Sequence, residues 1–194
     1  GAYFSDIENS MGNVFGAANE FPAAGAGVVI NEINWAGSNG DGLDEWVELY
    51  NTTSASIDLT NWVVENLGTG SGPGANVVIP SGTIPGGGFF LISNKDKAAS
   101  KINVDPDLMP LNLSLNNDGE QLILKNSGDD VIDVANGIKK WFAGDESPRK
   151  TMERIDPNVD GTLSTNWMDA STHTGMDVGG PTDEFGTPKN FNGL

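Results

Sequence analysis

The chain contains no cysteine and only one histidine, His173. The absence of cysteine excludes thiol catalysis, zinc sites built on cysteine, and disulfide bonds. His173 lies in the polar stretch "ASTHTGMD", which is typical of an exposed loop side chain. Walker A, G-x-S-x-G and dinucleotide-binding patterns are also missing from the sequence. These absences leave the carboxylates as the side chains to test for chemistry.

Basic residues are scarce. The sequence has 10 Lys and Arg against 27 Asp and Glu, which gives a formal net charge of −17 at pH 7. Because binding to nucleic acid and to anionic membranes depends on Lys and Arg, neither is an expected partner. An acidic surface attracts divalent cations and basic partners instead. No apolar run is long enough to cross a bilayer, so no membrane span is expected in the mature chain.

Short strand-like runs separated by turn residues make up most of the chain from Val28 onward. Alternating and β-branched residues predict strands at residues 28–35, 44–51, 56–66, 76–79, 88–93, 120–126 and 130–136. The spacers are rich in Gly, Asn, Asp and Pro, and "NNDGEQ" (116–121) and "NSGDD" (126–130) predict tight hairpins. Regular short strands of this kind predict an all-β sandwich or barrel.

Helix is scarce in this pattern, and "NKDKAASK" (94–101) is the best candidate for one. After Met152 the chain becomes rich in Gly, Asp and Thr. We expect this last stretch to wrap the domain as ordered loop.

Several of these runs together resemble a known family. The segments "VINEINW", "DEWVELYNTTSASIDLTNWVVEN", "IPGGGFFLIS", "LNNDGEQLILKN" and "MERIDPNVDGTLSTNW" resemble the lamin-tail domain in its bacterial extracellular form, over roughly residues 28–190. The resemblance implies an immunoglobulin-like antiparallel β-sandwich and no catalytic site. Nuclear lamins attach this domain to a coiled-coil rod, which is absent from this sequence, so a nuclear scaffold role is not expected.

The first residues differ from the rest in their residue pattern. We therefore divide the chain into an extension (1–25) and a lamin-tail-like sandwich with its C-terminal wrapping loop (26–194). "GAYFSDIENSMGNVFGAANEF" (1–21) is similar to the mature start of secreted TasA/camelysin-type proteins, which include biofilm-fibre subunits. That similarity implies removal of a signal peptide and an extracellular or cell-surface location. The candidate assembly residues are Tyr3, Phe4, Ile7, Met11, Val14 and Phe15.

Two conformations of this segment remain open. Phe4, Ile7, Met11 and Val14 have the spacing of an amphipathic helix, whereas the many Ser, Asn and Gly residues favour short extended pieces broken at Gly12. Either form leaves an apolar face that needs a partner, either its own domain or a second copy. Insertion into a second copy is a heterologous contact, which grows a filament.

The sequence therefore predicts a non-catalytic, exported structural subunit that forms a homopolymer, either an extracellular filament or a surface layer. The alternative is a cell-surface module that binds a glycan or a protein ligand. Such a module needs an exposed aromatic patch, which Trp35 and Trp141–Phe142 would offer.

A carboxylate pair is the first candidate for chemistry. Glu32 and Glu48 lie at like parity on two strands that can pair, with Asp41, Asp44 and Glu45 in the loop between them. Two close carboxylates can share a proton or a metal ion, and a pair about 5 Å apart is the arrangement of a retaining glycosidase. The favoured alternative is a solvated acidic face with no chemistry, so an enzyme is not expected.

A possible calcium loop is the second candidate. Asp156, Asn158 and Asp160 stand at alternate positions before Gly161, as in the first half of a calcium-binding loop, and the Thr162 carbonyl would follow as a ligand. The usual bidentate Glu at position twelve is replaced by a tryptophan. The alternative is an Asp/Asn/Gly turn that hydrogen-bonds its own backbone.

If calcium binds at this loop, the melting temperature of the chain in millimolar calcium will fall when EGTA is added. Binding to the native state alone stabilises it by about 2.7 kcal/mol at a hundredfold excess of ligand over Kd, and extracellular modules bind calcium with Kd of roughly 0.1–1 mM. The fall should disappear in Asp156→Ala and in Asp160→Ala. Identical melting curves of the unmodified chain in calcium and in EGTA would rule out the site.

Overall fold

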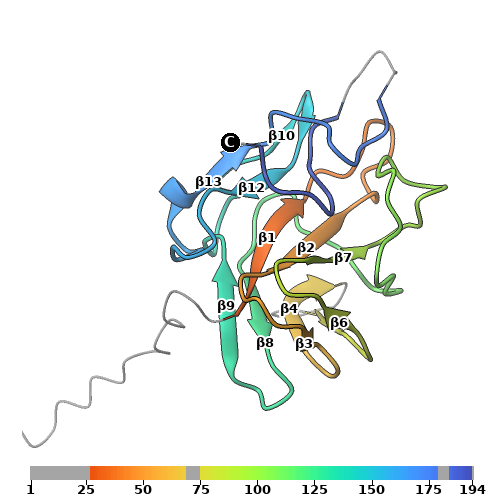
Figure 1. Cartoon of the computed structure of the whole chain (residues 1–194). Helices are drawn as coiled ribbons and strands as arrows, with labels where there is room; N and C mark the ends of the chain where they lie inside the picture. The colour runs from red at the N-terminus through yellow and green to blue at the C-terminus, as the bar shows by residue number, and fades with distance from the viewer. Residues whose placement is uncertain (1–26, 69–74, 179–183, 194) are drawn as a thin grey trace, which may run out of the picture.

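The structure is a computed structural model, and it describes residues 27–68, 75–178 and 184–193. Short strands and the loops between them make up these residues (Figure 1). The strands are β1 (Val28–Asn34), β2 (Trp46–Asn51), β3 (Ile57–Asp58), β4 (Val63–Gly68), β5 (Ala75–Val78), β6 (Thr83–Ile84), β7 (Phe89–Ser93), β8 (Leu122–Lys125), β9 (Val131–Ala135), β10 (Asp145–Glu146), β11 (Arg149–Lys150), β12 (Met152–Arg154) and β13 (Trp167–Asp169). A single 3₁₀ turn, η1 (Ser164–Asn166), precedes β13.

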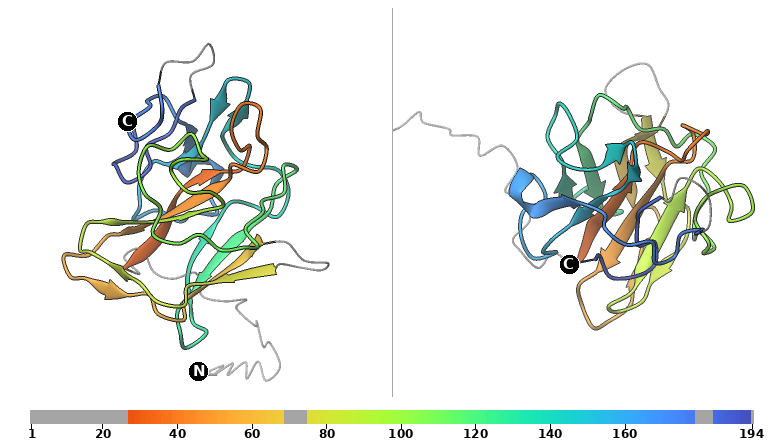
Figure 2. Two further views of the ribbon diagram at one scale, coloured as in Figure 1. Left: turned by 90° about the vertical axis from the view of Figure 1, so that its right-hand side faces the viewer. Right: turned by 90° about the horizontal axis from the view of Figure 1, so that it is seen from above.

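Two antiparallel sheets form the domain. One has five strands in the order β13-β12-β1-β2-β7, and the other has four in the order β5-β4-β8-β9. The short pairs β3-β6 and β10-β11 lie beside them (Figure 2). The expected all-β, immunoglobulin-like antiparallel sandwich is confirmed. Within the described residues, no helix is long and apolar enough to span a membrane.

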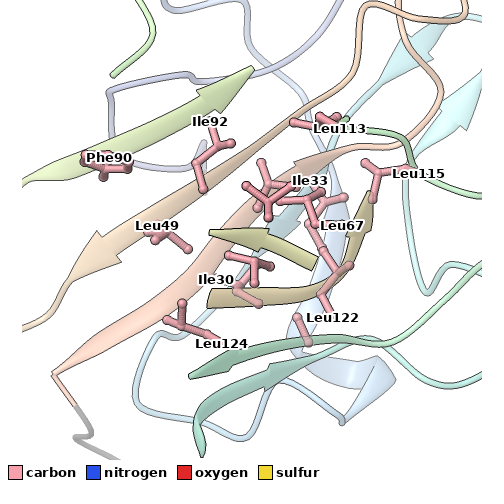
Figure 3. Close-up of a cluster of buried hydrophobic side chains, with 14 of the residues drawn as sticks. Ile30, Ile33, Leu49, Leu67, Phe90, Ile92, Leu113, Leu115, Leu122 and Leu124 are labelled. Atoms are coloured by element: carbon pink, nitrogen blue, oxygen red, sulfur yellow. The ribbon is translucent and has the colours of Figure 1, made fainter. Parts of the chain in front are cut away.

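The main core lies between the two sheets. Ile30 and Leu49 from the five-stranded sheet meet Leu67, Leu122 and Leu124 from the four-stranded sheet, and all five side chains are buried (Figure 3). Burying each such side chain stabilises the fold by roughly 1.5–3 kcal/mol. The core therefore accounts for the alternation of apolar residues along the predicted strands.

Strand β2 shows that the five-stranded sheet is covered on both faces. Val47 and Leu49 point into the core, whereas Trp46 and Glu48 lie on the opposite, outer face. All four side chains are completely buried. Trp46 packs in a second apolar cluster with Leu91, Ile102 and Met176. Loops from later in the chain thus form a layer over the outer face.

Other local predictions have mixed outcomes. Residues 126–130 join β8 to β9 as the predicted tight hairpin, whereas the turn at 116–121 precedes β8 and joins no strand pair. The predicted helix at 94–101 is wrong, since this stretch forms turns. Both the backbone carbonyl and the side chain of Asp96 accept a hydrogen bond from Ala99 N, which closes a single turn there.

The stretch after Met152 contains more sheet than expected. Strand β12 pairs with β1 near the middle of the five-stranded sheet, and β13 pairs with β12 at its edge. Glu153 and Arg154 place charged groups on the two faces of β12, so this strand has no apolar alternation. Both charges are buried, and their burial depends on partners that are distant in sequence.

A buried ion pair connects the two sheets. Arg154 Nη1 on β12 lies 2.7 Å from Asp133 Oδ2 on β9, and both side chains are nearly inaccessible. The backbone of Ile30 on β1 joins this contact, with its N–H donating to Asp133 and its carbonyl accepting from Arg154. Burial raises the pKa of the Asp133 carboxyl, and the Arg154 guanidinium acts against this shift by lowering it. Each partner of such a pair depends on the other.

The variant Asp133→Asn should destabilise the chain by about 3–5 kcal/mol at pH 7, because it leaves the Arg154 charge buried without its counterion. Urea unfolding monitored by circular dichroism measures the difference. Glu65→Gln is the matched control, since it removes a more exposed pair with Lys125, and it should cost about 1 kcal/mol or less. Equal losses in the two variants would contradict this account of the ion pair.

Candidate functional site

Three glutamates lie side by side on the outer face of the five-stranded sheet. Glu32 on β1 pairs directly with Glu48 on β2 and with Glu153 on β12. The predicted pairing of Glu32 with Glu48 is therefore confirmed, whereas the place of Glu153 was not predicted. All three side chains are completely buried. We call these three residues the carboxyl layer.

Residues 184–193, which we call the C-terminal segment, lie over the carboxyl layer (Figures 1 and 2). The N–H groups of Thr187 and Gly193 donate to Glu32 and Glu153 at 2.9 and 3.2 Å. The N–H of Lys189 donates to Glu48. Three backbone donors of one irregular segment thus use the three carboxyls as acceptors, which satisfies buried backbone groups that have no strand partner.

Burial changes the acidity of the layer. Desolvation, with a smaller contribution from the nearby Glu153 carboxylate, raises the pKa of Glu32 from 4.5 to about 8. Desolvation also raises the pKa of Glu48 well above its usual value, and the charge of Glu32 adds to this shift. The pKa of Glu153 is raised by burial as well. Glu32 is therefore protonated in the native chain at neutral pH.

The contacts of the Thr187 hydroxyl are compatible with a proton on Glu32. Its Oγ1 lies 2.9 Å from Glu153 Oε1, 3.1 Å from Glu32 Oε2 and 3.3 Å from Asn192 Oδ1. A hydroxyl carries one proton, so it can donate to only one of these three oxygens. A protonated Glu32 carboxyl can donate to Thr187, which then donates to Glu153.

The expectation of a solvated acidic face at Glu32 and Glu48 is wrong. The strand pattern places both glutamates on the outer face, but it does not reveal that a segment more than a hundred residues away covers that face. With no exposed surface, the two carboxyls offer nothing for a substrate to contact. Their role is to form hydrogen bonds with the backbone N–H and side-chain hydroxyl groups of the C-terminal segment.

The acids of the loop between β1 and β2 take separate partners. Asp41 forms an ion pair with Lys95. Asp44 and Glu45 are buried, and among the described residues Asp44 Oδ1 and Glu45 Oε2 have no hydrogen-bond partner. Burial raises the pKa of Glu45 to about 7, although the Leu115 N–H hydrogen bond lowers it. These contacts connect the 37–45 loop to neighbouring loops.

His173 is not the exposed loop side chain that the sequence predicts. Its ring lies 4.5 Å from the ring of Phe185 and is half-buried. Its Nδ1 is 3.0 Å from the carbonyl oxygen of Glu184. His173 therefore packs against the first residues of the C-terminal segment.

The predicted calcium ligands lie on a loop between β12 and β13. Asp156 Oδ1 accepts hydrogen bonds from the backbone N and side-chain Nδ2 of Asn158, at 2.8 and 3.1 Å. Asp160 Oδ1 accepts from N and Oγ1 of Thr162, both at 2.8 Å. Across the described ranges, no group of three or more His, Asp or Glu side chains is arranged to hold a metal ion. Calcium binding at this loop stays a prediction.

The Asn166 side chain holds the same loop together. Its Nδ2 donates to the carbonyls of Asp156 and Val159, both at 3.0 Å, and lies 3.5 Å from that of Asp160. Its Oδ1 accepts from Asp156 N at 2.9 Å. A single buried amide thus satisfies loop carbonyls that would otherwise need water or a cation. Sequence reasoning missed this role of Asn166.

Trp35 and Trp141 do not form the exposed aromatic patch that the alternative function, a binding module, needs. Trp35 and Trp141 are buried and stacked, with ring centroids 6.1 Å apart. Their indole N–H groups donate to the carbonyls of Ala143 and Asn116, both at 2.9 Å. Because each polar N–H has a partner, both indoles can lie inside the domain. Phe142 is half-buried and packs against the same core.

An exposed aromatic cluster lies elsewhere, at Tyr50, Phe89 and Phe191. The ring centroids are 5.1 to 5.9 Å apart, and Phe191 is 71% exposed. The cluster lines one side of a pocket of about 210 Å³. Ile155 and Pro157 add to its apolar walls, and its polar lining comes from Asn31, Arg154 and Asn192. We call it the aromatic pocket; a lone Phe191 among Asn and Gly residues gave no sequence signal for it.

The candidate assembly residues are not placed by the structure. Tyr3, Phe4, Ile7, Met11, Val14 and Phe15 lie outside the described residues. Their attachment point is described, because Gly27 O accepts a hydrogen bond from Thr52 N and Val29 pairs with Tyr50. Gly27, the first described residue, is thus two residues before the partner of Tyr50, which belongs to the aromatic pocket.

Comparison with known families agrees with this architecture. The model of the family described as Lamin Tail Domain matches residues 22–138. No curated protein matches the chain.

The carboxyl layer makes the stability of the chain depend on pH. The pKa of Glu32 is higher in the folded state than in the unfolded state. Between pH 4.5 and about 8, the folded state therefore keeps a proton that the unfolded state has already released. Stability therefore falls as pH rises through this window, by up to about 1.4 kcal/mol per pH unit for one group. Glu32→Gln should make the decline shallower, since the amide stays neutral and keeps the hydrogen bonds.

Urea unfolding at pH 5, 6, 7 and 8 measures this slope. Glu146→Gln is the control, because Glu146 is exposed on β10, and it should leave the slope unchanged. Equal slopes for Glu32→Gln and the unmodified chain would show that Glu32 does not carry the proton.

Proposed function

Because the chain belongs to the lamin tail domain family, we propose that it is an exported, non-catalytic structural subunit that assembles head to tail through residues 1–21. The family is a non-enzymatic, immunoglobulin-like sandwich that often has structural or protein-interaction roles. The similarity of residues 1–21 to secreted fibre subunits supports export and assembly. The partner in this proposal is a second copy of the chain.

One observation carries the proposal: the chain has both an apolar segment and an exposed aromatic surface near the same end of β1. The segment contributes Tyr3, Phe4 and Phe15, and the surface contributes Phe191 with its neighbours. Exposed aromatic clusters are uncommon on isolated domains and mark interaction sites. Two different complementary surfaces on one chain give a heterologous contact, which repeats without closing.

The high net charge sets a condition on this assembly. Each subunit carries −17, so neighbouring copies repel one another at low ionic strength. Salt screens this repulsion over roughly 10 Å at 0.1 M. We therefore propose that assembly is favoured by salt and by divalent cations, including any calcium at Asp156, Asn158 and Asp160.

The second candidate function is a surface module for a protein ligand, which the aromatic pocket favours. A glycan fits this pocket less well, because sugar hydroxyls need free polar partners. The amides of Asn31 and Asn192 already bond to each other, and they also bond to Glu48 and to the Arg154 carbonyl. The pocket is thus suited to an apolar side chain.

We expect the full chain to form species larger than a dimer at high concentration in millimolar calcium, and the chain lacking residues 1–24 to stay monomeric. Light scattering and negative-stain microscopy measure both. Full-length Ile138→Ser is the control, because it removes another exposed apolar side chain and should assemble normally. A full chain that remains monomeric, or stops at a closed dimer, would contradict the proposal.

A further inference from the structure

We propose that the aromatic pocket is the acceptor site for residues 1–21 of a second copy, and that it takes one aromatic side chain of that segment. This inference rests on the proposed function and names the surface that the donor segment occupies.

The size of the pocket fits a single side chain. Its volume of about 210 Å³ is below the roughly 300–1,000 Å³ of sites that bind small molecules. The apolar walls are Tyr50, Phe89, Phe191, Ile155 and Pro157. Burying one aromatic ring against such walls removes a large apolar area from water.

The amide groups of Asn31 and Asn192 are already engaged in hydrogen bonds, whereas the buried Arg154 Nε has no hydrogen-bond partner among the described residues. Asn31 Nδ2 donates to Asn192 at 3.0 Å, and Asn192 Nδ2 donates to the Arg154 carbonyl at 2.7 Å. A ligand rich in hydroxyl groups would have to break these bonds or leave its own groups unpaired. An aromatic or aliphatic side chain has no such requirement.

A cation is an equally poor fit. Aromatic cages hold a cation among the faces of their rings, and this needs space between the rings. The centroids of Tyr50, Phe89 and Phe191 are only 5.1 to 5.9 Å apart, so the rings contact one another directly. The open volume lies beside the cluster and is bounded by Ile155 and Pro157.

The charge of the donor segment matches this surface. Residues 1–26 contain Asp6, Glu8 and Glu20 and no Lys or Arg. The pocket lining contains no Asp or Glu, although the chain as a whole is strongly acidic. Docking there places Phe4, two residues from Asp6, against walls that carry no carboxylate, although the exposed Asp156 lies between the lining residues Ile155 and Pro157.

The length of the segment allows docking on a neighbour. Twenty-six residues precede Gly27, and a chain of that length can span up to about 85 Å when extended. A domain of this size has a radius of gyration of roughly 15 Å. Residues 1–21 of one copy can therefore reach the pocket of the next copy.

Two matched variants separate donor from acceptor. In the full chain, Phe191→Ala removes the most exposed pocket wall, and Phe4→Ser with Phe15→Ser removes two donor rings. Each variant alone should assemble at least about tenfold more weakly than the unmodified chain, since each loses a buried aromatic contact. Val178→Ala is the control, because Val178 is similarly exposed and lies outside the pocket lining, and it should assemble normally.

Mixing the two variants is the decisive test. The Phe191→Ala chain keeps its donor segment and the Phe4→Ser/Phe15→Ser chain keeps its pocket, so an equimolar mixture should form one-to-one heterodimers by light scattering. Thermal melting confirms that both variants remain folded. A mixture that stays monomeric, or a Phe191→Ala chain that assembles like the unmodified one, overturns the acceptor assignment.

These outcomes separate the inference from the proposed function. If the unmodified chain assembles and Phe191→Ala assembles equally well, the structural role stands and the pocket is not the acceptor. If the unmodified chain forms only closed dimers that Phe191→Ala abolishes, the pocket is the acceptor and the filament is wrong. If the unmodified chain is monomeric and Phe191→Ala exposes residues 1–21 to protease, docking occurs within one chain and both proposals fail.

Discussion

Thr187 places one hydroxyl between the carboxyls of Glu32 and Glu153, and the outer face of the five-stranded sheet depends on this contact. Beyond the single bridge of Phe185 with Lys150, the C-terminal segment has no strand pairing, so its later backbone N–H groups need other acceptors. The carboxyl layer supplies them at Thr187, Lys189 and Gly193. Without cysteine, the chain has no covalent means of holding this segment. The hydrogen bonds to three buried acids take that role.

The same layer positions the exposed aromatic surface. Asn192 donates to Asn31 and to the Arg154 carbonyl, so it ties the end of the C-terminal segment to β1 and β12. Phe191, the preceding residue, is thereby held edge-on against Tyr50 and Phe89. The aromatic pocket is thus formed by residues from the first, middle and last parts of the chain. Its shape depends on the buried hydrogen bonds beneath it as much as on the rings themselves.

The local sequence pattern predicts much of the sandwich, but it predicts little of the layer that covers the outer face of the five-stranded sheet. The alternation of Val47 and Leu49 and the turn at 126–130 depend on neighbouring residues, so the sequence reveals them directly. Strand β12 was missed because Glu153 and Arg154 interrupt the apolar pattern, and β13 was missed because its three residues are too few to show alternation. Glu32 and Glu48 were paired correctly, but their burial is set by residues 187 and 189. Trp35 and Trp141 lie in the core, as expected of the tryptophans in general, but the sequence does not reveal which carbonyls accept from their N–H groups.

The carboxyl layer costs stability and gives the sheet a unique register. Burying three acids shifts their pKa values upward, which shows that their charged forms are disfavoured in the fold. A slip of one residue in β1 would move the Glu32 side chain from beneath Thr187 into the apolar core. Its carboxyl would lie there among apolar side chains, away from its present hydrogen-bond partners. A one-residue slip in β2 would do the same to Glu48. The layer therefore penalises wrong pairings of β1, β2 and β12 more strongly than apolar residues would. A slip of two residues, which apolar alternation alone allows, would keep Glu32 on the outer face but move it away from the N–H and hydroxyl of Thr187, which leaves buried polar groups without partners.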